Sequence, residues 1–91
     1  MSGSLSTAIA VNQVATSTTS AEAVAARKSR YRVILKNIDP SITIYIGTGT
    51  VTAANSIPLL AGESVALETS AAVNALAASG TPSLAYAEEY R

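Results

Sequence analysis

The stretch YRVILKNIDPSITIYIGTGTVTAANSIPLLAGESVAL, residues 31–67, decides the fold. Two dense apolar runs, residues 33–38 and 42–46, are rich in β-branched side chains, which favour a pleated and packed surface. Between them lies Asp39-Pro40-Ser41, where Pro40 fixes its own φ and drives Asp39 toward an extended conformation. The Asp39 carboxylate is also placed to accept hydrogen bonds from the turn backbone. The pattern predicts a β-hairpin at the centre of an all-β domain.

Further strands are expected on both sides of this centre. Alternating or β-branched residues predict strands at residues 9–19, 21–26, 57–60, 64–69 and 83–90. In the first of these, Ile9 and Val11 share one face. Pro58 places its strand at a sheet edge, and Gly62 makes a tight turn at 61–63 inexpensive. Residues 71–78 fit either a strand or a helical turn. Short strands with turns about every 8–12 residues predict a single small β-sandwich or barrel of about 6–8 antiparallel strands.

The expected organisation is one β-domain, residues 9–91, preceded by a flexible N-terminal arm. Residues 1–8 (MSGSLSTA) are small and polar and cannot bury much area. A chain of 91 residues is marginal in size for a stable domain. The chain has no Cys and no His, which excludes disulfides and the common zinc sites, so oligomerisation is the expected reinforcement. No apolar run approaches the roughly 18–20 residues that span a bilayer, and no signal peptide is expected.

The sequence offers little catalytic chemistry. Without His or Cys, a Ser–His–carboxylate arrangement cannot form within one chain. Glu88 and Glu89 point to opposite faces of a predicted strand, and most carboxylates are interpreted as solvated charges. The segment GTGTVT, residues 47–52, lacks the pattern of a phosphate loop and predicts a bulge or bend. We therefore expect no enzyme activity, no catalytic residues, no metal site and no cofactor.

Basic residues concentrate at one place in the chain. Five of the six lie between residues 27 and 36, with a tyrosine among them. By period two, Arg30 and Arg32 are expected to share one face with Lys36. The simpler interpretation is that these residues are solvent-exposed at the start of a strand, where their charges discourage edge-to-edge aggregation. The functional interpretation is a contact patch for an acidic partner or for a phosphate backbone. Arg and Tyr are enriched at protein interfaces. The candidate contact residues are Arg27, Lys28, Arg30, Tyr31 and Arg32.

Net charge and aromatic content limit the partners further. The net charge is zero and only 13% of residues are charged, which argues against a polyanion binder, so no nucleic acid is expected. Sparse charge also fits a surface covered by neighbouring subunits. The four aromatic residues are expected in the core or in subunit contacts rather than on a ligand. They are Tyr31, Tyr45, Tyr86 and Tyr90.

Several short segments between residues 27 and 90 form a recognisable series. A basic turn is followed by ITIYIGTG, by IPLLAGESVAL, by a small-residue strand, by an A-S-G-T turn and by a final strand. This series resembles small all-β structural proteins of tailed-phage virions, in particular capsid decoration (cement) proteins. The resemblance implies a bacteriophage virion protein at the capsid surface that contacts the major capsid protein, as a homo-oligomer with a homotrimer favoured. It carries over no catalytic residues.

Two alternatives to a decoration protein stay open at this stage. The first is a fibre, spike, or portal or tail adaptor module of a phage virion, for which the sequence pattern is nearly the same. The second is a glycan- or nucleic-acid-binding β-module that would use the basic residues around Tyr31.

Overall fold

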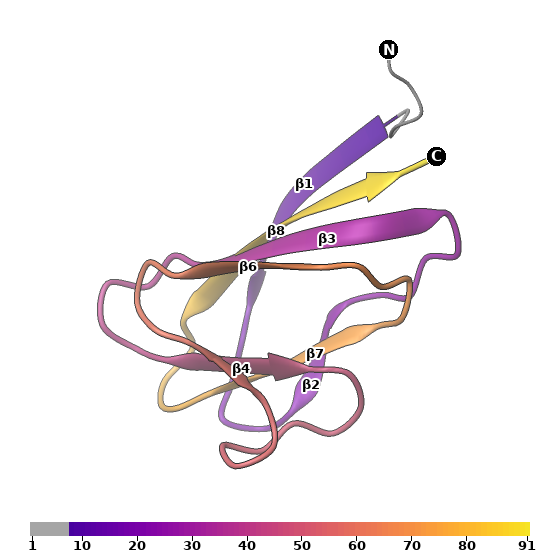
Figure 1. The fold of residues 1–91 in the computed structure, drawn as a ribbon. Coiled ribbons are helices and arrows are strands. Elements are labelled where there is room, and N and C mark those ends of the chain that lie inside the picture. Colours follow the sequence, from indigo (N-terminus) through magenta and orange to yellow (C-terminus); the bar gives the residue numbers. More distant parts are fainter. Residues whose placement is uncertain (1–7) are drawn as a thin grey trace.

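The computed structural model describes residues 8–91. All the regular secondary structure in this range is β-strand (Figure 1). No helix in this range is long and apolar enough to cross a membrane. The predicted arm, residues 1–8, lies outside the described residues except for Ala8, where the first strand begins. The strands are β1 (Ala8–Ala15), β2 (Ala21–Val24), β3 (Arg30–Asn37), β4 (Ile44–Gly47), β5 (Ile57–Leu59), β6 (Ser64–Leu67), β7 (Val73–Ala77) and β8 (Ser83–Tyr90).

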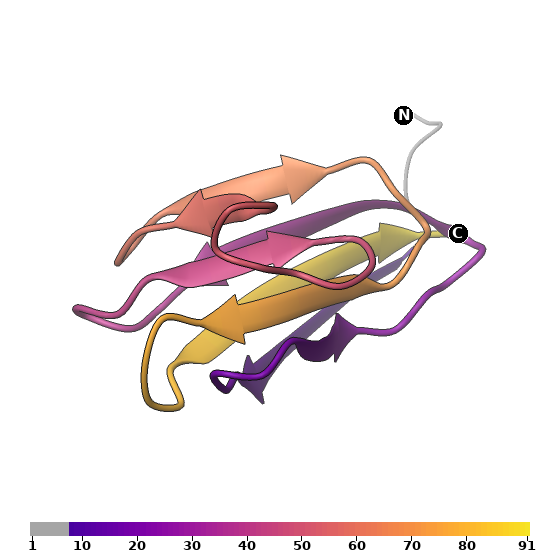
Figure 2. The same cartoon turned by 90° about the horizontal axis from the view of Figure 1, so that it is seen from below.

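The strands form two four-stranded antiparallel sheets that face each other. Their orders are β1-β8-β3-β6 and β2-β7-β4-β5, and the two layers are visible in Figures 1 and 2. The all-β fold predicted from the sequence is therefore confirmed, as a sandwich. Residues 71–78, for which strand and helix were both open, contain β7. Most connections pass from one sheet to the other, and only β4 and β5 are neighbours in both sequence and sheet.

The central hairpin predicted from the two apolar runs is wrong. β3 and β4 belong to different sheets, because β8 and β6 already occupy both edges of β3. The buried side chains of β3 therefore meet those of β4 across the core instead of lying beside them. Alternating apolar residues look the same in both arrangements, because either one buries one face of each strand. Residues 38–43 are thus a crossing between sheets rather than a hairpin turn.

Asn37 and Asp39 shape this crossing. The fully buried Asn37 amide donates to the carbonyl oxygens of Ile42 and Leu59, at 2.7 and 2.8 Å, and so connects β3 to the opposite sheet. Its Oδ1 accepts from the Asp39 N–H at 2.9 Å. One Asp39 carboxylate oxygen accepts from the N–H groups of Ser41 and Ile42, at 2.9 and 2.7 Å. The predicted contact between Asp39 and the turn backbone is therefore present.

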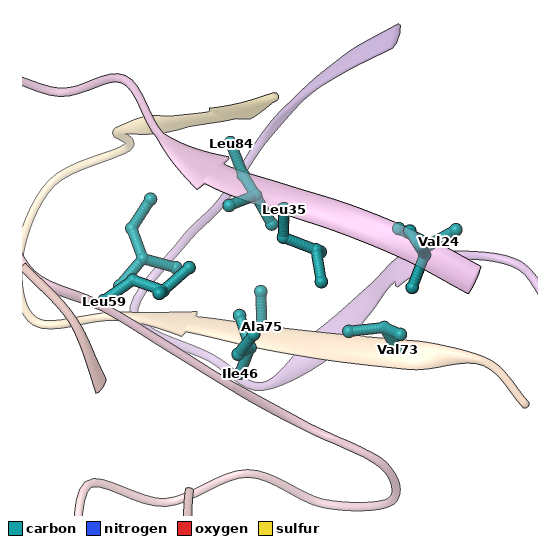
Figure 3. Close-up of a cluster of buried hydrophobic side chains, with 9 residues drawn as sticks. Val24, Leu35, Ile46, Leu59, Val73, Ala75 and Leu84 are labelled. Carbon is teal, nitrogen blue, oxygen red and sulfur yellow. The ribbon is translucent and has the colours of Figure 1, made fainter. Parts of the chain in front are cut away.

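The core lies between the sheets and is small. Its buried cluster takes side chains from both layers, and Leu35 and Ile46 at its centre are fully buried (Figure 3). At about 25 cal/mol per Å² of apolar surface, each large aliphatic side chain contributes about 1.5–3 kcal/mol. The cluster consists of Val24, Val33, Leu35, Ile44, Ile46, Leu59, Val73, Ala75 and Leu84.

Two predictions about local geometry are confirmed. Pro58 lies in β5, which is the edge strand beside β4. Gly62 has a φ of +80°, a conformation that costs other residues strain, and its N–H donates to the Asn37 carbonyl. Some strand ends differ from expectation. The strand expected over residues 9–19 ends at Ala15, where the chain turns toward the other sheet.

Replacing Asn37 tests the crossing. Asn37→Ala leaves the carbonyls of Ile42 and Leu59 without a donor, the second of them buried, so we expect the free energy of unfolding to fall by about 2–4 kcal/mol. Asn37→Asp is expected to lower the free energy of unfolding by at least as much at pH 7. This loss should shrink at low pH, where the carboxyl is protonated and can donate a hydrogen bond. Urea denaturation at several pH values measures both. Asn55→Asp, at an exposed position, is the control and should stay within about 0.5 kcal/mol.

The Asp39 carboxylate predicts an acid-sensitive turn. Hydrogen bonds from the backbone N–H of Ser41, and then of Ile42, lower the Asp39 pKa from its ordinary value of 3.8. A group whose pKa is lower in the folded state stabilises the fold above its unfolded pKa, and this stabilisation is lost as the pH falls through the folded pKa. Wild type should therefore be more stable than Asp39→Ala at pH 5–7, and the difference should shrink below about pH 3.8. Thermal melts across this range measure it, and a constant difference would contradict the assignment.

Candidate functional site

The basic cluster predicted at residues 27–32 lies where β3 begins and β8 ends, and its centre is buried. Arg30 is 2% exposed, so it is unavailable to a partner, and its inclusion among the contact residues is wrong. Its guanidinium donates to the Glu88 carboxylate at 2.7 Å and to the Ala25 carbonyl at 2.9 Å. It also donates to the carbonyls of Thr69 and Ala71 in the β6–β7 connection. Arg30 therefore joins β3 and β8 to the two connections that run between the sheets at this end.

A β-bulge explains why period two misplaced Arg30. In the ladder with β8, Arg30 lies opposite Tyr90 and Arg32 lies opposite Glu89, so Tyr31 is an extra residue on β3. The extra residue reverses the alternation, because side chains on either side of a bulge fall out of phase. Arg30 consequently points into the sandwich and Arg32 points out. The two arginines do not share a face as predicted.

Glu88 and Glu89 provide matched partners on these two faces. Glu88, 8% exposed, pairs with Arg30, and Arg27 Nη1 lies 3.9 Å from its second oxygen. Glu89 accepts from Arg32 at 2.6–2.8 Å on the outer face. The two glutamates do occupy opposite faces, but Glu88 is a buried ion-pair partner and not a solvated charge. The signal in the sequence for this pairing was two adjacent glutamates on one predicted strand and two arginines close together on another.

The remaining predicted contact residues lie around this buried pair. The guanidinium of Arg27 stacks over the Tyr90 ring, with 3.9 Å from its central carbon to the ring centroid. Arg91 lies over Tyr31 at 5.5 Å, and Lys28 is exposed. Both contacts are cation–π pairs, which are worth about 0.5–1 kcal/mol at exposed sites. The accessible residues of the set are therefore Arg27, Lys28, Tyr31 and Arg32, gathered at one end of the molecule.

A second candidate surface, missed from the sequence, is the outer face of the β1-β8-β3-β6 sheet. One cross-strand row on this face is wholly apolar, since the ladders align Val11 with Ala87, Ala87 with Ile34, and Ile34 with Ala66. Val11 is 72% exposed. The Ile9–Val11 pattern was recognised, but without strand order its face could not be identified as the outer one. The result is an apolar stripe across four strands.

The outer face is shallow and carries charge only at its margins. A hollow of about 150 Å³ lies over Val11, Ile34 and Ala87 and reaches Lys36. The Arg32–Glu89 pair borders the stripe on one side, and Lys36 borders it on the other. Such a face suits a flat protein surface better than a small molecule, because ligand sites are usually concave and enclose most of the ligand.

A larger open groove of about 450 Å³ lies at the crossing between β3 and β4, beside the turn at Gly62. Its polar members are Lys36, Asn37 and Asp39, and the amide of Asn37 and the carboxylate of Asp39 already hydrogen-bond the backbone. Across residues 8–91, no three His, Cys, Asp or Glu side chains come together in a way that could hold a metal ion. The groove thus offers few free groups to a ligand.

No family model and no curated protein matches the sequence. Two solved structures match this chain. One is the stem and receptor-binding domain of the spike protein P1 from bacteriophage PM2, with a TM-score of 0.68 and 21% identity over 88% of this chain. This chain spans 32% of that chain. At this identity the likeness shows the fold alone. The other is a Bacillus endospore appendage, a disulfide-linked pilus, with a TM-score of 0.49 and 23% identity, covering 97% of this chain and 90% of that one.

Arginine substitutions test whether the buried Arg30–Glu88 pair contributes more to stability than the Arg32–Glu89 pair on the outer face. Arg30→Ala leaves Glu88 and three carbonyls without their donor, so the free energy of unfolding should fall by about 3–5 kcal/mol. Arg32→Ala removes a partly exposed pair with Glu89 and should cost at most about 1 kcal/mol. Urea denaturation compares the two. Should Arg30→Ala not fold, Arg30→Lys, which keeps the charge but not the fork of donors, should still be clearly less stable than Arg32→Ala. Equal losses would contradict the structural role of Arg30.

Proposed function

We propose that the chain is a non-enzymatic structural module on the exterior of a virion, of the spike or fibre type. The observation that carries the proposal is the sandwich itself, whose fold matches the phage PM2 spike domain over 88% of this chain. The site geometry is compatible with it, because Arg30 and Arg32 pair with Glu88 and Glu89, and the outer face of the β1-β8-β3-β6 sheet carries a flat apolar stripe. Such a stripe suits attachment to another protein.

The capsid decoration protein is the second candidate, and the outer-face stripe is the observation that favours it. A protein that binds only the assembled shell stabilises the shell by mass action, and a broad shallow face fits a junction between subunits of the major capsid protein. In this case the stripe through Ile34 would lie against the shell. Receptor binding, which belongs to the PM2 spike, is not needed for either candidate. The favoured homotrimer and the absence of nucleic-acid binding stay predictions.

A test of both candidates locates the chain in particles and then perturbs the stripe. Antibodies raised against the folded chain should label purified particles from the source culture. Few copies at single vertices support a spike or adaptor, and many copies over the shell support decoration. Particles without any copies would overturn the virion proposal.

The same particles test whether the stripe is the attachment surface. Ile34→Lys should lower rebinding of purified protein to depleted particles at least about tenfold, because a charge at the centre of an apolar contact must be desolvated. Leu60→Lys, at an exposed apolar residue in the β5–β6 connection, is the matched control and should rebind normally. Normal rebinding of Ile34→Lys would exclude the stripe as the attachment surface.

A further inference from the structure

β1 has an open edge. It pairs with β8 on one side, from Ala8 opposite Tyr90 to Ala15 opposite Ser83, and no described strand lies on its other side (Figure 1). The backbone N–H and C=O groups on that side of an edge strand are unpaired and can template another strand. An eight-residue antiparallel pairing supplies about eight backbone hydrogen bonds. β1 therefore presents a complete strand-length binding surface.

The other three sheet edges are protected in ways that β1 is not. β5 has three residues and contains Pro58, and β2 has four residues, a register shift and the exposed Glu22. β6 has four residues and lies between Glu63 and Glu68. Short length, proline, bulges and charge are the usual devices against edge pairing. β1, with the sequence AIAVNQVA, has eight residues, an unbroken register, no charge and no proline.

The side chains of β1 also favour a partner. Ile9 and Val11 are 61% and 72% exposed, and both lie on the outer face of the sheet. The charges nearest to them on β8 are Glu88 and Glu89, and each already has an arginine partner. A second strand approaching this edge therefore finds apolar side chains and no unpaired carboxylate on the neighbouring strand.

We propose that β1 pairs antiparallel with β1 of a second copy about a twofold axis, so that two four-stranded sheets become one eight-stranded sheet. A second copy is the occupant that fits because β1 is the long unprotected edge, and only a twofold arrangement brings this edge against itself. Pairing with β2, β5 or β6 of another copy would require a short or protected strand. The inference does not rest on the proposed function, and a twofold pair differs from the homotrimer that the virion resemblance implies.

Twofold symmetry restricts the register. When β1 pairs with itself and residues on the same face lie opposite one another, the registers with the longest overlap place Val11 opposite Val11, Gln13 or Ile9 of the second copy. Opposite side chains on one face have Cβ atoms about 5 Å apart, which is close enough for crosslinking through introduced cysteines. The chain has no cysteine of its own, so introduced thiols give an unambiguous signal.

Sedimentation and light scattering across a concentration series test the pair. Wild type should show a concentration-dependent dimer. Val11→Lys should weaken dimerisation at least about tenfold, since a lysine on an edge strand opposes pairing. Ala66→Lys, in the same cross-strand row but on the protected β6 edge, is the matched control and should leave the dimer intact. A monomer at all concentrations, a trimer, or equal weakening by both substitutions would overturn the proposal.

Cysteine crosslinking is a second measurement that does not require Val11→Lys to fold. Val11→Cys alone, a mixture of Ile9→Cys and Val11→Cys chains, or a mixture of Val11→Cys and Gln13→Cys chains should form a disulfide-linked dimer under mild oxidation, according to the register. Ala66→Cys should not. Absence of crosslinks in all three β1 experiments would overturn the pairing. These results are independent of the particle tests, because they need only the purified chain.

Discussion

The buried Arg30 guanidinium is the interaction on which the rest of the structure depends. An isolated charge in a protein interior is very costly, and here it is offset by one carboxylate and three backbone carbonyls. These acceptors come from β8, from the β2–β3 connection and from the β6–β7 connection, which bring both sheets to one point. Replacing Arg30 and Glu88 by apolar residues would not reproduce this, because the carbonyls of Ala25, Thr69 and Ala71 would lose their donor.

Asn37 performs a similar task at the opposite end of β3. Its amide donates to carbonyls before β4 and in β5 of the other sheet, whereas Arg30 binds the connections that lead to that sheet, so each end of β3 carries a buried polar side chain that helps to hold the two layers together. Between them lies a core of nine side chains, which is small for two sheets. Aliphatic burial alone is non-directional, whereas satisfied buried polar groups fix one arrangement. The two ends of β3 therefore set how the sheets align, and the apolar cluster supplies most of the stabilisation.

Much of the fold could be predicted from the sequence, and the failures have physical causes. Alternation and turn residues located the strands, and Pro58 correctly marked an edge. The same alternation cannot distinguish strands that pair within a sheet from strands that face each other across a core, so β3 and β4 were joined wrongly. Period two also assumes an unbroken ladder, so the bulge at Tyr31 reversed the expected orientation of Arg30. Both errors concern long-range pairing, which no local pattern encodes.

The sparse charge of the sequence takes on a definite meaning in this structure. Arg30 and Arg32 are matched by Glu88 and Glu89, so four of the few charged residues neutralise one another around β3 and β8. What remains on the outer face is the apolar row through Ile34, and this row ends at the open edge of β1. Association with another chain would address both the small core and the unprotected edge, because it would bury apolar surface and pair the free backbone groups of β1. The fold therefore leaves an apolar row and a free strand edge that contact with another chain would cover.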